Sequence, residues 1–264
     1  MRGPRAAGGS LVAAAAHIGL AARAFVYLLI AWLALQIARG HTTQQANQKG
    51  AVATIAQHHG GKVLLIVLGL GLACYALWRL SEAAFGTSTD GKKAGPRLKS
   101  LVRGVIYGAF AVTTFLFVIG MHGTGQAQQQ ETATARVMKH GYGRLVVAVA
   151  GIIVLLVGLE MIVSGVRKKF TKQLRMHELS SPTRTAVTRL GVVGNCARGA
   201  VFAIAGALVI DAAVRYQPSK SAGLDGAFRT LVNQPFGPVL VGLAAAGLFA
   251  FALFGLAEAR WVRT

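Results

Sequence analysis

Charged residues inside long apolar runs are the first candidates for chemistry in this sequence. Arg23, Arg79, Glu160 and Asp211 each interrupt such a run. A charge within a membrane-spanning helix costs at least about 2.5–3.5 kcal/mol, so it usually faces the bundle interior or a cavity. Glu160 and Asp211 are therefore candidates for a proton or cation path. The two carboxylates fall at different depths, so they need not contact each other. The alternative is that each has a buried partner or lies near the membrane interface.

Histidines form a second candidate group. His58, His59 and His140 occupy matching positions in two loops, where converging imidazoles would suit a metal ion. No Cys or carboxylate stands at a recognisable ligand spacing. We therefore expect these histidines to be ordinary loop residues, and we predict no bound metal or other cofactor. The sequence also lacks a Walker loop, a Rossmann fingerprint and a nucleophile elbow. We therefore assign no catalytic residues and expect no enzymatic activity.

The elements that must position these residues are membrane-spanning helices. Six segments approach the roughly 20 apolar residues that cross a bilayer, and they cover residues 21–38, 63–80, 104–121, 145–163, 197–214 and 239–257. Membrane β-barrels alternate apolar and polar residues, whereas these runs are continuously apolar. With 54% hydrophobic residues and only 14% charged, the chain is neither disordered nor typical of a soluble nucleic-acid binder.

The distribution of Lys and Arg predicts the orientation. Of the 28 basic residues, 19 fall near the two termini or in the linkers 79–103 and 164–198, and nine fall in the other three loops. The positive-inside rule then predicts a protein of the bacterial cytoplasmic membrane with both termini in the cytoplasm. The first helix begins too late to resemble a signal peptide. Basic clusters beside the spans favour anionic lipid headgroups as partners, with no nucleic acid.

Internal repetition is the most informative pattern. Every odd-numbered span opens with an arginine followed four residues later by an aromatic residue: Arg23 and Tyr27, Arg103 and Tyr107, Arg198 and Phe202. Every following loop ends at a glycine: Gly61, Gly143 and Gly237. An acidic residue stands 21 positions after the first and third of these glycines, as Glu82 and Glu258. The spacings between copies agree closely, so the chain is a threefold tandem repeat.

This repeat predicts an all-α polytopic bundle of six transmembrane helices, built from three parallel hairpins around a pseudo-threefold axis along the membrane normal. The expected units are residues 1–86, 97–170 and 190–264. Short helices are expected over 51–57, 132–139 and 223–233, before the loop glycines. The Gln-, Thr- and Ala-rich tract 123–134 is expected to be mostly flexible loop.

The repeated openings and the Thr230–Gly237 loop resemble the bacterial membrane family called Domain of Unknown Function 1206. The resemblance covers nearly the whole chain and is closest in the third copy. The other copies replace Gln234-Pro235 with His58-His59 and His140-Gly141. The family resemblance implies three two-helix repeats and a membrane location, but it implies no activity.

Two roles remain open for the repeated arginines. Each can lie over the ring at i+4, and we predict that the pairs Arg23–Glu82 and Arg198–Glu258 fasten two hairpins. Alternatively the arginines snorkel to lipid phosphates or form a basic ring around an anionic headgroup or solute. The leading functional prediction is a non-catalytic accessory or scaffold subunit that binds lipids or a membrane-protein partner. A small ion or solute channel or transporter is second, and a lipid- or cofactor-handling enzyme last.

Overall fold

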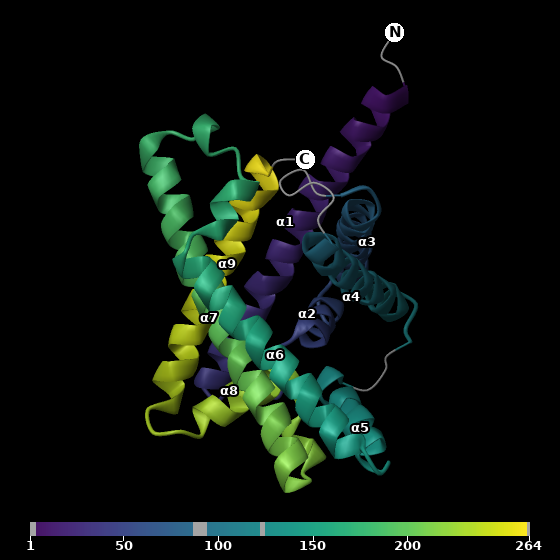
Figure 1. Cartoon of the computed structure of the whole chain (residues 1–264), viewed down its shortest axis with the longest axis vertical. Coiled ribbons are helices and arrows are strands. Elements are labelled where there is room, and N and C mark those ends of the chain that lie inside the picture. The colour runs from purple at the N-terminus through teal and green to yellow at the C-terminus, as the bar shows by residue number, and fades with distance from the viewer. Residues whose placement is uncertain (1–3, 87–93, 122–124, 263–264) are drawn as a thin grey trace.

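Six long helices dominate the computed structural model, which describes residues 4–86, 94–121 and 125–262 (Figure 1). They are α1 (Pro4–Ala38), α3 (Gly61–Phe85), α4 (Ala94–Val118), α6 (Gly143–Val166), α7 (Ser181–Arg215) and α9 (Gly237–Trp261). Each is long and apolar enough to cross a membrane, which confirms the predicted fold class. Among the described residues there is no strand, only an isolated bridge between Leu174 and Val262.

Three short helices lie in the half of the molecule away from the termini (Figure 1). They are α2 (Gln48–Ala56), α5 (Gln126–Met138) and α8 (Gly223–Val232). In that view α5 and α8 lie lower and α2 lies nearer the middle. We call the end away from the termini the short-helix side and the opposite end, where α1 begins and α9 ends, the termini side. Three 3₁₀ turns complete the described chain: η1 (Lys169–Gln173), η2 (Met176–Glu178) and η3 (Pro218–Lys220).

The prediction of a flexible loop over 123–134 is wrong for most of that tract. Helix α5 begins at Gln126, so the Gln- and Ala-rich residues form its first turns. Gln, Ala and Glu are good helix formers. Two residues on one face, Ala127 and Met138, are buried, which anchors the helix to its neighbours.

The repeated loop glycine has a steric cause that is the same in all three copies. Gly61, Gly143 and Gly237 are each the first residue of a returning helix. A Cβ atom there would lie 2.1, 1.7 or 2.0 Å from a carbonyl oxygen of the preceding short helix or its end. Only glycine lets the chain turn this tightly between the short helix and the span.

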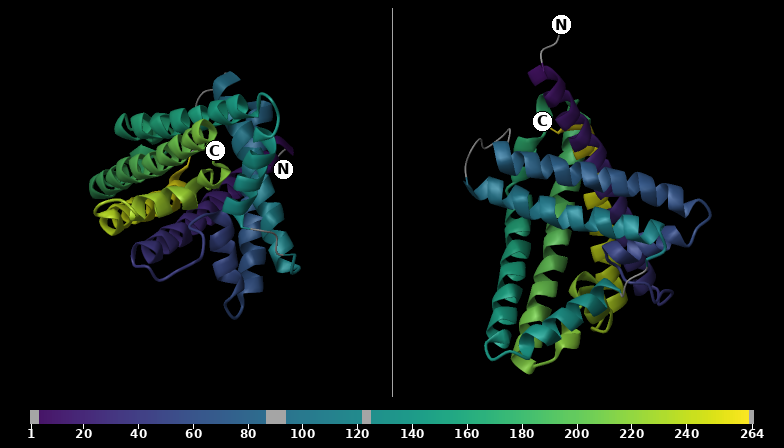
Figure 2. Two further views of the ribbon diagram at one scale, coloured as in Figure 1. Left: turned by 90° about the horizontal axis from the view of Figure 1, so that it is seen from below. Right: turned by 90° about the vertical axis from the view of Figure 1, so that its right-hand side faces the viewer.

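Neighbouring repeats are joined by three equivalent helix pairs: α3 with α4, α6 with α7, and α9 with α1. Each pair combines the second helix of one repeat with the first helix of the next, as the pseudo-threefold arrangement requires. Helices of the same repeat also pack in the first (α1 and α3) and third (α7 and α9) copies. In the described chain α4 and α6 form no such pair, and Figure 2 shows them running in different directions. The second repeat is therefore open.

A close helix contact joins α6 to α7 through glycines. A Cβ on Gly158 would lie 2.5 Å from the nitrogen of Ala203 and 2.7 Å from the oxygen of Gly199. Such close backbone approach is how helices associate where lipid removes the hydrophobic driving force between them. Helix α6 thus depends on α7 for its position, while most of its surface faces outward.

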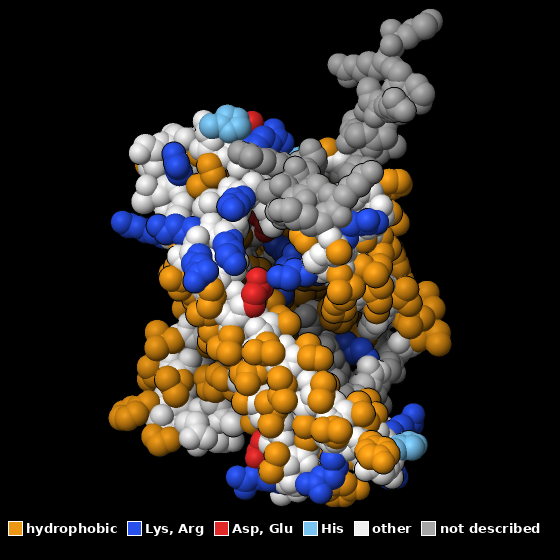
Figure 3. Space-filling view, in the orientation of Figure 1, with side chains coloured by type: hydrophobic (Ala, Val, Ile, Leu, Met, Phe, Trp, Pro, Cys, Tyr) orange, Lys and Arg blue, Asp and Glu red, His pale blue; other side chains and the backbone are white. Residues whose placement is uncertain are grey.

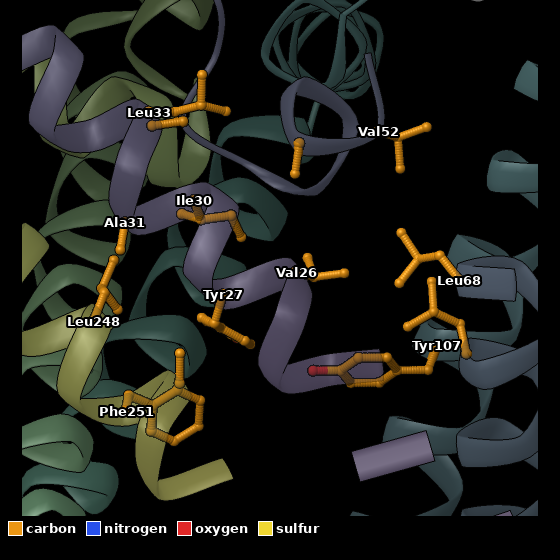
Figure 4. Close-up of a cluster of buried hydrophobic side chains, with 14 of the residues drawn as sticks. Val26, Tyr27, Ile30, Ala31, Leu33, Val52, Leu68, Tyr107, Leu248 and Phe251 are labelled. Carbon is orange, nitrogen blue, oxygen red and sulfur yellow. The ribbon is translucent and has the colours of Figure 1, made fainter. Parts of the chain in front are cut away.

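An apolar core fills the bundle between its two ends (Figure 4). Its buried side chains include Val26, Tyr27, Ile30, Leu68, Tyr107, Leu248 and Phe251. Helix α2 closes this core from the short-helix side, because its Val52 and Ile55 belong to the same cluster. Burial also lowers the pKa of the α2 residue Lys49 below its ordinary value.

Candidate functional site

The first repeat arginine lies in a buried network near the termini side. The Arg23 guanidinium donates to the Glu258 carboxylate at 2.5 Å and to the Tyr75 hydroxyl at 3.1 Å. Arg23 and Glu258 are both buried, with side chains 7% and 9% exposed. This ion pair crosses from α1 to α9, so it joins the first repeat to the third.

The second acidic residue of the repeat has a different partner. Glu82 accepts from Arg79 at 2.6 Å and from the Ser100 hydroxyl at 3.0 Å. Arg79 also donates to the Tyr75 hydroxyl at 3.1 Å, so this hydroxyl accepts from two guanidinium groups, those of Arg79 and Arg23. A continuous polar network therefore runs from α9 through α1 and α3 to α4.

The predicted pairs Arg23–Glu82 and Arg198–Glu258 are wrong. Glu258 pairs with Arg23, and Glu82 pairs with Arg79 on its own helix. For Glu258 the reason is that α9 packs more closely on α1 than on α7, so its carboxylate meets the arginine of the first repeat. Glu82 instead has Arg79 within reach one turn earlier on α3.

The predicted contact between each arginine and its i+4 ring holds for one copy. The Arg198 guanidinium lies 5.3 Å from the Phe202 centroid. Arg23 instead lies over Tyr75 and Phe251, at 5.4 and 5.6 Å. Tyr27 is turned into the core, where it packs edge-on against Phe251 at 4.8 Å.

Arg103 and Arg198 differ from Arg23 in having no acidic partner within the described chain. Arg103 lines the same cavity as Arg79 and Arg198, so like charges face it there. The Arg198 Nε atom is sealed from solvent and has no hydrogen-bond partner among the described residues. The position that holds Glu82 and Glu258 in the other copies is Ser164 in the second. Positive charge is therefore left uncompensated beside α6.

A cavity of about 590 Å³ lies at this point, between α3 and α4 on one side and α6 and α7 on the other. Six cationic side chains and two carboxylates line it: Arg79, Lys99, Arg103, Lys169, Lys172, Arg198, Glu82 and Glu160. In Figure 3 the Lys and Arg side chains gather in the upper part of this face, above a surface that is mainly hydrophobic. The site is a strongly basic hollow at the edge of an apolar band.

Comparison of equivalent positions explains why the hollow opens in the second repeat. Tyr75 and Phe251 are 0% and 3% exposed, whereas their counterpart Val157 is 40% exposed. One turn further on, Trp78 and Phe254 are buried, whereas their counterpart Glu160 is half exposed. Smaller or charged residues on α6 replace the large side chains that fill the same space in the other copies.

The two carboxylates considered for a transport path lie apart. Glu160 lines the basic cavity and pairs with Lys99 across the gap between α6 and α4, at 3.0 Å. Asp211 lies at the short-helix end of α7, where it pairs with Arg215 at 2.6 Å and with Lys220. On α7, the stretch between the cavity and Asp211 contributes Val201 and Ala205 to the buried apolar core. The hollow beside α2 measures about 10 Å³ and scarcely admits one water molecule.

The loop histidines make local contacts. His58 and His140 each place Nδ1 near the backbone oxygen four residues earlier, at 2.8 and 3.1 Å. His59 is exposed. Within the residues that the structure describes, no group of three His, Cys, Asp or Glu side chains converges on a common point.

Sequence reasoning missed the roles of Tyr75, Arg79 and Lys99. Arg79 was visible as a charge near the end of an apolar run, but its counterparts are Met161 and Gly255, so the repeat gave no support for it. The contribution of Tyr75 depends on the packing of α3 against α1 and α4, which no local pattern specifies.

The comparisons with known proteins agree with this threefold architecture. The family model Domain of Unknown Function (DUF1206) matches residues 18–86, 98–168 and 193–262. The chain belongs to this family. Each matched segment falls inside one predicted unit, and together they carry the six apolar helices of a multi-pass membrane protein.

One curated relative is similar along most of its length. It is the "Uncharacterized protein YxxB" of Bacillus subtilis (strain 168), 25% identical over 243 residues that cover 91% of this chain and 87% of the relative. No solved structure matches the chain.

Proposed function

We propose that this chain is a non-catalytic accessory protein of the bacterial cytoplasmic membrane that binds an anionic phospholipid between α4 and α6. The observation that carries the proposal is the convergence of Arg103 and Arg198 on a membrane-level cavity, with no acidic partner for either in the described chain. Uncompensated charge of this kind is costly away from water, and a bound anion would offset the cost.

The apolar walls of the opening suit lipid chains. Towards the short-helix side of the cavity, the face of α4 that carries Arg103 continues with the exposed Ile106 and the partly buried Phe110. The face of α6 that carries Glu160 exposes Ile153 and Leu156. These are the two long helices with the least buried apolar windows. A phosphate in the basic hollow would therefore leave its acyl chains against apolar side chains.

The level of the hollow also fits a headgroup. It lies near the termini side, and 19 of the 28 Lys and Arg residues belong to the termini and linkers that the sequence assigns to that side. The same bias supports a cytoplasmic location for both termini, and anionic lipids attract basic residues there by about 1 kcal/mol each.

The packed core weighs against a channel along the bundle axis, because Glu160 and Asp211 are separated by it and each has its own basic partner. Ion flux through the wild-type chain in proteoliposomes, lost in Glu160→Gln, would overturn this preference for lipid binding.

The test is native mass spectrometry of the full chain, purified in a mild neutral detergent. The wild type is expected to retain an anionic phospholipid. The double variant Arg103→Gln/Arg198→Gln is expected to lose it, since both guanidinium groups of the cavity that have no acidic partner in the described chain are removed. The matched control Arg39→Gln/Arg136→Gln removes two exposed charges from the short-helix side and should retain the lipid. Equal retention by the two double variants, or none by the wild type, would refute the proposal.

A further inference from the structure

The charges in the basic cavity identify the headgroup more closely. Resting on the proposed lipid-binding function, we infer that the lipid ends in a terminal phosphate, a phosphomonoester or diphosphate with at least two negative charges. A phosphodiester, which carries one negative charge, would leave more of the positive charge of the cavity unbalanced. The inference follows from which cations remain unpaired and from what replaces the repeat acid.

Two ion pairs neutralise part of the lining. Arg79 pairs with Glu82, and Lys99 pairs with Glu160. Four cations remain, and none has an acidic partner in the described part of the chain: Arg103, Arg198, Lys169 and Lys172. The two guanidinium groups are half-buried inside, and the two ammonium groups are exposed at the mouth. This is more positive charge than a diester can balance.

A terminal phosphate matches this arrangement in both charge and geometry. Its second ionisation has a pKa of about 6, so it carries close to two negative charges at neutral pH. It also presents three terminal oxygens, where a diester presents two. Planar guanidinium groups bind such oxygens in pairs, and ammonium groups add further donors.

Ser164 supplies the second line of argument. The first and third repeats hold a carboxylate at this position, and the second holds a small hydroxyl on the wall of the cavity. A carboxylate there would lie among the same cations and repel a phosphate dianion. Its replacement by serine removes that repulsion and adds a neutral hydrogen-bond donor.

The basic surface continues beyond the mouth. Lys172 also lines a second cavity of about 740 Å³, whose other cations are Lys168, Arg184 and Arg189. Among the described residues, no carboxylate lines this cavity. The electrostatic potential outside the lipid site is therefore positive as well. A positive potential favours the headgroup with the larger negative charge.

Trp78 provides a reporter inside the site. It lines the cavity, and the Arg79 guanidinium lies 4.0 Å from its ring. The remaining tryptophans, Trp32 and Trp261, can be changed to Phe so that only Trp78 emits. Binding is then followed by fluorescence of the full chain in phosphatidylcholine nanodiscs that contain increasing fractions of phosphatidic acid or phosphatidylglycerol.

At pH 8 phosphatidic acid is expected to bind at least about tenfold more tightly than phosphatidylglycerol, because each added charge-assisted hydrogen bond strengthens binding. At pH 5 the phosphomonoester loses its second charge, so the preference should shrink. Ser164→Glu should abolish the preference and Ser164→Thr should keep it, with Arg39→Gln/Arg136→Gln as a control for overall charge.

Each contrary outcome is distinct. Equal affinity for the two lipids, lost in Arg103→Gln/Arg198→Gln, would overturn the terminal-phosphate inference and leave the proposed function standing. Binding of neither lipid would overturn both. Inorganic phosphate that binds the chain in phosphatidylcholine nanodiscs as tightly as phosphatidic acid does would identify a soluble ligand and overturn a lipid one.

Discussion

The second repeat differs from the first and third in how its two helices meet. In the outer copies the two spans pack together, and large side chains fill the space between them, including Tyr75, Trp78, Phe251 and Phe254. In the second copy α4 and α6 stand apart, and the equivalent residues on α6 are Val157 and Glu160. The same sequence pattern thus produces two closed hairpins and one open one.

The difference shows which contacts the repeat requires. The three turns at the loop glycines and the three pairs between neighbouring repeats are retained in every copy. They suffice to hold α4 against α3 and α6 against α7. Contacts inside a hairpin are therefore dispensable, and the copy that gives them up gains a basic cavity. We place the proposed lipid-binding site in the second repeat, which is the copy that departs from the symmetry.

The largest effect should come from the buried ion pair that the second repeat lacks. Glu258→Ala leaves Arg23 buried without its carboxylate, which should lower the free energy of unfolding by about 3–5 kcal/mol. Glu160→Ala, in the open repeat, removes only an exposed pair and should cost less than about 1 kcal/mol. Unfolding in detergent, followed by circular dichroism, measures both. Equal losses would mean that the two repeats are equally closed.

A reciprocal exchange between repeats should have unequal consequences. Phe251→Val removes a buried ring and should lower the free energy of unfolding by about 2–3 kcal/mol. Val157→Phe places the ring of the third repeat in the opening of the second, where it should change stability by less than about 1 kcal/mol and reduce lipid retention. The same unfolding assay and native mass spectrometry test this exchange. A large loss of stability in Val157→Phe would show that the opening is already filled.

The turn glycines should be sensitive in all three copies. Gly237→Ala forces the new methyl group against the Val232 carbonyl and should lower the free energy of unfolding by about 1–3 kcal/mol. Gly242→Ala, one turn along the same helix, meets nothing within 4 Å and serves as the control. If the two substitutions had the same effect, the steric explanation of the repeat motif would fail.

Much of the fold could be predicted from the sequence. The six spans follow from apolar length, and the three units follow from the spacing of Arg23, Arg103 and Arg198 with the loop glycines. Both patterns are local in the chain, and a bilayer restricts the structures that satisfy them. The short helices were also predictable, because each stretch has apolar residues at helical spacing and is followed by the loop glycine.

The partners of the arginines could not be predicted in the same way. Connectivity suggested that Glu82 would meet Arg23 within one hairpin, but the closest pairs form between repeats. The opening of the second repeat follows from Val157, Glu160 and Ser164 taken together with the glycine contacts of α6 on α7. Those contacts with α7 determine where α6 lies, and they are visible only in three dimensions.

The separation of α4 and α6 can be measured directly by pulsed electron paramagnetic resonance in lipid nanodiscs. Spin labels at the exposed positions Val105 and Ile152 report on the second repeat, and labels at their counterparts Ala200 and Ala246 report on the third, each in a chain whose Cys74 and Cys196 are replaced by Ser. The structure predicts a clearly longer distance between α4 and α6 than between α7 and α9. Equal distances would contradict an open second repeat and the lipid site placed in it.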